Sequence, residues 1–253
     1  VNRKFCAYLK LLCLFNCLLF AAIIFTNTKE ISVRRNKFYK NCDHDAGRVD
    51  IMGFEKEVKQ QYIIANDKAA RAHRGSAKQF AIKHPVVLEN ILDRNKIAYK
   101  IELGVLEIPT NQIVGIAAAD QRELLYASNF MPLSKANTEF ANTWRHLYQE
   151  FLSDDGLCKP IRCYEYLGKF YVQDGAKRVS VLKHHGAATV FSEVIRIMPN
   201  CTQERNVQNY YEFLQHFRLT RLYQIYFSNP GDFVKLQSAL GHEANYRWND
   251  TDR

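Results

Sequence analysis

Apolar residues recur at three- and four-residue spacing in several parts of the chain, which is typical of amphipathic helices. Residues 54–96 are rich in Ala, Lys, Gln and Glu and predict two or three helices, one of them beginning at Pro85. Apolar faces predict two further helices, one over residues 137–152 and one from Val207 to Phe217. We expect both faces to pack into the core.

Strand patterns lie between these helices. Apolar and polar residues alternate over residues 99–109 and again over 188–197. Residues 161–166 and 169–173 predict a hairpin that turns at Leu167-Gly168. The order of the elements predicts an α+β fold.

We expect three parts in the folded chain: a helical segment over residues 52–100, a small mixed sheet with helices over 101–199, and an incomplete helical module over 200–253. The 253 residues are 47% apolar, which is enough to bury a core and excludes a disordered or fibrous protein. Seven cysteines are too few for a disulfide scaffold, and their spacing predicts no metal site. We interpret Cys158 and Cys163 as reduced, buried thiols.

The N-terminal residues leave two alternatives. The apolar stretch from Phe5 to Phe25 has about the length of a bilayer-spanning helix, so residues 1–28 are either a transmembrane segment or untranslated upstream sequence. An irregular linker over residues 29–51 follows. A start at Met52 predicts a cytoplasmic protein, whereas a genuine span predicts a single-pass membrane protein with a cytoplasmic C-terminal domain, because basic residues follow the span.

The formal net charge of +9 is unevenly distributed. Residues 1–51 and 52–100 each carry +5, whereas residues 101–253 carry −1. Four basic residues of the second segment share helical spacing, and they form either a nucleic-acid-binding face or an ordinary solvated helix face. These residues are Lys68, Arg71, Arg74 and Lys78.

The junction around Asp174-Gly175 is the most informative place for chemistry. Residues 174–186 predict the end of a strand, a tight turn, a helix and a terminating glycine. The first amides of such a helix lack partners within it and, together with the helix dipole, attract anions. Lys177 and Arg178 fall in the first turn, where cations are unfavourable unless an anion binds. The pattern fits a phosphate site and also an ordinary basic turn.

Four stretches together resemble the ParB/sulfiredoxin superfamily, and specifically its ParB N-terminal-type domain. They are IPTNQIVG at 108–115, Gln121-Arg122, PIRCYEYLGKFYVQDGAKRVSVLKHHGAATV at 160–190 and VIRI at 194–197. The resemblance covers about residues 101–199, and residues 219–253 are similar to the segment that follows this domain in divergent bacterial relatives. It implies a small mixed sheet that holds phosphate with a loop arginine and a G-x-x-R-type turn.

Carried over by position, the resemblance implies that Gly175 is the turn glycine, Arg178 the phosphate-facing arginine and Arg122 the loop arginine. Lys177 stands where close relatives have His, which puts chemistry attributed to that His in doubt. Ala176 stands where sulfiredoxins have a reactive Cys, so sulfiredoxin activity is not expected. We also expect the head of Arg178 to be exposed. The implied phosphate or nucleotide site comprises Asp174, Gly175, Ala176, Lys177, Arg178 and Arg122.

The resemblance implies a phosphate-anchored binding domain for a nucleotide or a nucleic-acid backbone, with a nucleoside triphosphate and Mg as the implied cofactor. ParB-type domains bind cytidine triphosphate and act around DNA. Two alternatives stay open. One is an enzyme that hydrolyses nucleotides or phosphodiesters, for which Asp174 with Glu165 or Glu193 would supply the acidic groups. The other is a membrane-anchored interaction module with no ligand at the turn.

Overall fold

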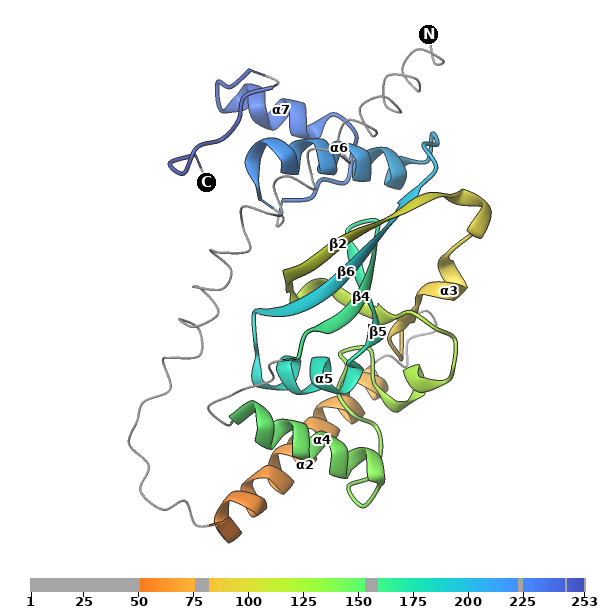
Figure 1. The fold of residues 1–253 in the computed structure, drawn as a ribbon, viewed down its shortest axis with the longest axis vertical. Helices are drawn as coiled ribbons and strands as arrows, with labels where there is room; N and C mark the ends of the chain where they lie inside the picture. Colours follow the sequence, from red (N-terminus) through yellow and green to blue (C-terminus); the bar gives the residue numbers. More distant parts are fainter. Residues whose placement is uncertain (1–50, 76–81, 153–158, 223–224, 244, 253) are drawn as a thin grey trace. The chain divides into compact units, whose positions relative to one another are not determined.

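The computed structural model describes residues 51–75, 82–152, 159–222, 225–243 and 245–252, with residues 51–53 described for the backbone alone. These ranges form an α+β fold with a mixed sheet, as the sequence predicts (Figure 1). The predicted span and linker lie outside them. No helix in the described ranges is both long and apolar enough to cross a bilayer.

Helices and strands follow one another in an order close to the predicted one. The helices are α2 (Ile51–Gly75), α3 (Leu88–Ile91), α4 (Glu139–Leu152), α5 (Ala176–His185), α6 (Arg205–Thr220) and α7 (Asp232–Ala239). The strands are β1 (Val86–Val87), β2 (Ile97–Pro109), β3 (Ile113–Ile116), β4 (Ile161–Tyr166), β5 (Lys169–Asp174) and β6 (Thr189–Pro199). Three single-turn 3₁₀ helices are η1 (Arg94–Lys96), η2 (Thr110–Gln112) and η3 (Arg122–Leu125).

The prediction of a helix that begins at Pro85 is wrong. Pro85 is followed by the two-residue strand β1, and helix α3 begins only at Leu88. Val86 and Val87 are β-branched residues, which favour strands. They pair with Gly115 and Ile116 of β3, and the sequence pattern had not predicted β3 as a strand. Pairing with a distant strand therefore outweighs the local preference for helix after proline.

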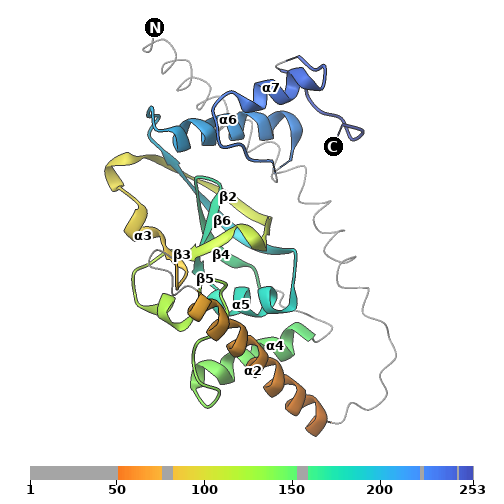
Figure 2. The ribbon, with the colours of Figure 1, turned by 180° about the vertical axis from the view of Figure 1, so that it is seen from behind.

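One half of the sheet is parallel. Among the described residues the whole sheet has six strands, in the order β1-β3-β5-β4-β6-β2. β3 lies beside β5 (Figure 2). β1 pairs in parallel with β3, and β3 pairs in parallel with β5, where Ile116 lies opposite Val172. The carboxyl ends of β1, β3 and β5 therefore meet at the same edge of the sheet, which is where open α/β sheets commonly bind ligands.

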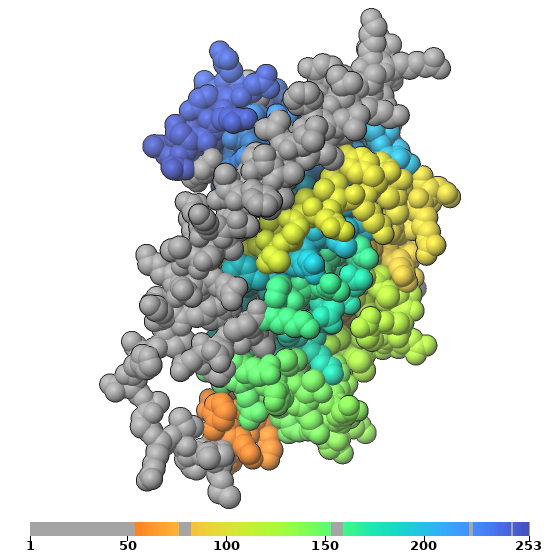
Figure 3. All heavy atoms as spheres, viewed as in Figure 1, coloured from red at the N-terminus to blue at the C-terminus, as the bar shows by residue number. Residues whose placement is uncertain are grey.

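The chain folds into two structural units. The first contains the described parts of residues 1–93, 102–165 and 169–196, and the second contains 94–101, 166–168 and the described residues from 197 onward. In the first unit, α5 lies between the sheet and the α2–α4 pair (Figures 1 and 2). Figure 3 shows α2 in orange beside α4 in green on one face of this unit.

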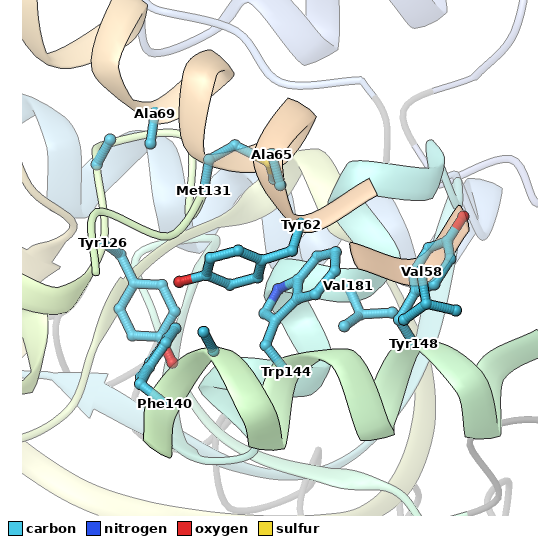
Figure 4. Close-up of a cluster of buried hydrophobic side chains, with 12 residues drawn as sticks. Val58, Tyr62, Ala65, Ala69, Tyr126, Met131, Phe140, Trp144, Tyr148 and Val181 are labelled. Atoms are coloured by element: carbon cyan, nitrogen blue, oxygen red, sulfur yellow. The ribbon is translucent and has the colours of Figure 1, made fainter. Parts of the chain in front are cut away.

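The core of the first unit is built around Trp144, which projects from α4 towards α2 and α5 (Figure 4). Its ring is fully buried and meets the edge of the Tyr62 ring at 5.3 Å between centroids. Its indole Nε1 donates a 2.9 Å hydrogen bond to Ser180 Oγ on α5, so the one polar group of the ring is satisfied. The predicted apolar face of residues 137–152 is thus confirmed as core.

The second unit has its own core, formed on α6 and α7 with the strand ends of that unit. Met198, Tyr210, Phe213 and Phe233 are its buried members. The amide of Gly231, at the start of α7, donates to both carboxylate oxygens of Glu212 on α6, at 3.0 and 2.7 Å. This carboxylate complements the positive end of the α7 dipole, so that helix start is already occupied by an anion of the protein itself.

Candidate functional site

The candidate site lies at the carboxyl edge of β1, β3 and β5, in the first unit. Helix α3 follows β1, the loop of residues 117–126 follows β3, and α5 follows β5. The loop is fixed at both sides, because Ala117 N donates to Val172 O of β5 and Ala119 N donates to Glu89 Oε2 of α3, each at 2.9 Å. The sheet therefore brings the predicted loop arginine and the predicted turn to the same edge.

The turn at Gly175 has the conformation that the sequence predicts. Gly175 lies in the left-handed region at φ +97°, and α5 begins directly after it. A β-carbon at this position would lie 2.7 Å from Ile161 Cγ2 and 2.9 Å from an Arg178 terminal nitrogen. Both the backbone angle and the close approach therefore require glycine. Among the described residues, no side chain caps the start of α5, so its first amides remain available to an anion.

The expected exposure of Arg178 is wrong, because only 11% of its side chain is exposed. Its Nη1 donates to the carbonyl oxygens of Lys159 and Pro160, at 2.5 and 3.0 Å, and its Nη2 donates to Asp174 Oδ2 at 2.9 Å. The guanidinium folds back against the turn because the two backbone carbonyls that lead into β4 accept its hydrogen bonds there. The guanidinium of Arg178 is therefore already hydrogen-bonded within the protein in the absence of any ligand.

Lys177 lies against one of a pair of aromatic rings, and the charge of Arg122 acts on the other. Lys177 Nζ lies 5.0 Å from the centre of the Phe140 ring, a cation–π contact, and Phe140 meets Tyr126 edge-on at 5.4 Å. Burial raises the pKa of Tyr126, and the nearby charge of Arg122 opposes that rise. Lys177 and Arg122, which are 55 residues apart in sequence, thus both act on this aromatic pair, Lys177 by contact and Arg122 through its charge.

Arg122 keeps most of its surface open. Its side chain is 57% exposed, and its Nε donates to Asp120 Oδ2 at 2.6 Å. Asp120 also accepts the backbone N–H of Arg122 at 3.1 Å, so one carboxylate fixes both the turn and the side chain. Within the described ranges the terminal nitrogens of Arg122 have no hydrogen-bond partner, and they remain able to bind an anion.

The acidic candidates for hydrolysis are engaged elsewhere. Glu165 is fully buried and pairs with Arg196 of β6, and Glu193 pairs with Arg162 at 2.7 Å. Asp174 pairs with Arg178. Among the described residues, no three His, Cys, Asp or Glu side chains are grouped so that they could hold a metal ion.

Two further titratable groups of the first unit lie against the core, although His184 Nδ1 is buried and has no hydrogen-bond partner among the described residues. His184 shares a hydrogen bond with Gln61 at 3.0 Å between Nε2 and Oε1, and burial lowers its pKa to about 4. Burial raises the pKa of the Cys163 thiol to about 12, which confirms the interpretation of a buried thiol and keeps it protonated. Cys158 lies outside the described residues.

The predicted basic face is partly visible. Lys68, Arg71 and Arg74 are exposed on α2, and Arg71 Nε donates to the Asp67 carbonyl at 3.3 Å. Lys78 lies outside the described residues. The exposure of the three suits a nucleic-acid face and a solvated helix face equally.

Glu89, Asp120 and Phe140 join the candidate site without having been predicted there. Asp120 had a local signal, because an Asp side chain in a turn often accepts the backbone N–H of the residue two positions later. Glu89 and Phe140 had none, because each acts on residues about thirty or more positions away.

Comparison of the chain with models of known families, with curated proteins and with solved structures finds no match in any of the three.

Proposed function

We propose that this protein is a ParB-like phosphate-binding domain whose ligand is held at the carboxyl edge of β1, β3 and β5. The phosphate would lie between Lys177, Arg122 and the first amides of α5. The observation that carries the proposal is that three parallel strands end at one edge, where Lys177 contacts the Phe140 ring and the charge of Arg122 acts on the adjoining Tyr126.

The chemistry of this edge favours a multiply charged anion. A lone helix start attracts anions weakly, but a cation from each side adds charge-assisted hydrogen bonds to the same group. Lys177 provides a compact ammonium, and Arg122 provides a planar fork with its terminal nitrogens free among the described residues. The ligand class is therefore a phosphate of a nucleotide or of a nucleic-acid backbone.

Binding without hydrolysis is the function that the site supports best. A hydrolase of this kind needs a general base and usually a divalent ion. Glu165, Glu193 and Asp174 are each held in an ion pair, so all three acidic groups named for that role are already paired. The resemblance to ParB-type domains, several of which bind a nucleoside triphosphate, supports the same interpretation.

The test is calorimetric titration of the whole chain with inorganic triphosphate, a panel of nucleoside triphosphates and duplex DNA, with and without Mg. Lys177→Met and Arg122→Gln should each weaken binding by about tenfold or more, because a charge-assisted hydrogen bond contributes roughly 1.5–3 kcal/mol. Arg162→Gln is the control, since Arg162 is an exposed arginine whose Nε already donates to Glu193.

The outcomes separate the ligand sources. Preference for nucleoside triphosphates over inorganic triphosphate would identify a nucleotide site, and stronger binding to DNA with a steep salt dependence would identify a backbone site. Release of phosphate during the titration would favour the hydrolase. No binding by the unmodified chain, or equal binding by Lys177→Met, would refute the proposal.

A further inference from the structure

The guanidinium of Arg178 is used as a structural tie, in contrast to the phosphate-facing role that the resemblance implies. It joins three pieces of backbone: the start of β4 through the Lys159 and Pro160 carbonyls, the end of β5 through Asp174, and α5, to which it belongs. With three acceptors and only 11% of the side chain exposed, the group is held in one orientation.

The tie and the glycine turn depend on one another. Nη2 of Arg178 lies 2.9 Å from the position that a β-carbon of residue 175 would take, so the guanidinium packs directly against the turn. Ile161, the first residue of β4, closes the other side at 2.7 Å. Gly175 is thus packed between Ile161 on one side and the guanidinium of Arg178 on the other.

We propose that Arg178 is the positioning residue of the phosphate site: it fixes the Gly175 turn against the start of β4 and thereby sets the direction of the first α5 amides and of Lys177. Lys177 directly precedes Arg178, and its ammonium reaches the Phe140 ring only if the first turn of α5 keeps its orientation. The positioning role rests on the proposed function, whereas the tie itself can be tested without any ligand.

Lysine cannot replace this arginine. A single ammonium on a flexible stem lacks the fork that reaches two carbonyls on one side and a carboxylate on the other. The proposal therefore predicts that Arg178→Lys, which keeps the charge, loses most of what Arg178→Ala loses. A residue that only attracted phosphate would keep a large part of its effect as lysine.

The experiment measures stability and binding in the same set of full-length variants: Arg178→Ala, Arg178→Lys and the control Arg162→Ala. Without ligand, both Arg178 variants should unfold about 5 °C or more below the unmodified chain, while Arg162→Ala should not. In titrations with inorganic triphosphate, both should bind about tenfold more weakly. The salt dependence of their residual binding should match the unmodified chain, because no direct contact has been removed.

Chemical rescue gives a readout that a general loss of stability would not move. Guanidinium chloride at low millimolar concentration should restore part of the triphosphate affinity of Arg178→Ala, compared with the same concentration of sodium chloride, and should not restore that of Lys177→Met. Failure of rescue together with a reduced salt dependence would assign Arg178 to direct contact and overturn the proposal.

The stability arm distinguishes this proposal from the proposed function. If the unmodified chain does not bind triphosphate, the proposed function fails and the positioning role fails with it, while lowered stability of both Arg178 variants would still establish the tie. If Arg178→Ala is as stable as Arg162→Ala, the tie is refuted whatever the unmodified chain binds.

Discussion

Substitution of Gly175 by alanine is the most direct test of the turn geometry. At φ +97°, an L-residue costs about 1–2 kcal/mol relative to glycine. The added β-carbon would also overlap Ile161 Cγ2 at 2.7 Å, and moving a packed side chain away costs roughly 1–3 kcal/mol more. We therefore expect Gly175→Ala to lower the free energy of unfolding by about 2–5 kcal/mol.

Gly186 is the matched control, because it ends the same helix at φ +83° and a β-carbon added there would meet no atom of the described residues within 4 Å. Gly186→Ala should therefore cost only the backbone part, about 1–2 kcal/mol. The assay is urea unfolding of both variants followed by circular dichroism. Equal losses for the two substitutions would show that the contacts of the turn with Ile161 and Arg178 do not constrain it, and the reasoning would be refuted.

Contacts of the first unit give three other predictions. Burial lowers the pKa of His184 from 6.5 to about 4, so between these pH values the unfolded chain binds a proton at this residue and the folded chain does not. The free energy of unfolding should therefore fall as the pH drops from 6.5 to about 4. His184→Gln should flatten this part of a pH series, whereas His146→Gln, at an exposed site, should not. Glu165→Gln should lower stability by about 3–5 kcal/mol in urea unfolding because it leaves the buried Arg196 without its charged partner, whereas Glu193→Gln, in an exposed pair, should change little. If α2 contacts DNA, replacing Lys68, Arg71 and Arg74 by Gln should reduce the slope of log affinity against log salt by about three, and an unchanged slope would place any contact elsewhere.

Elements with a strong local pattern could be predicted from sequence. The hairpin of β4 and β5, helix α5 with its flanking glycines and the apolar face of α4 all follow from signals within about fifteen residues of one another. β1 and β3 could not be predicted this way. β1 has two residues and β3 has four, and each is a strand only because a partner far along the chain pairs with it.

The candidate site also contains features that local sequence predicts and one that depends on distant residues. The glycine turn and the basic first turn of α5 are local, and the structure confirms the turn. The orientation of Arg178 is not local, because it is decided by two carbonyls that lie eighteen and nineteen residues earlier. Only one of its three acceptors, the carboxylate of Asp174, is local, and the other two are supplied by the backbone that leads into β4.

The parallel pairing of β1, β3 and β5 has a consequence for how the chain reaches its folded state. Val86 must find Gly115, 29 positions away, and Ile116 must find Val172, 56 positions away, so this edge closes long loops before its contacts form. Such pairings slow folding relative to helices and hairpins, whose contacts are near in sequence. The edge should therefore be among the last parts of the first unit to assemble. A phosphate ligand held there would bind only the assembled chain and would slow its unfolding without speeding its early collapse.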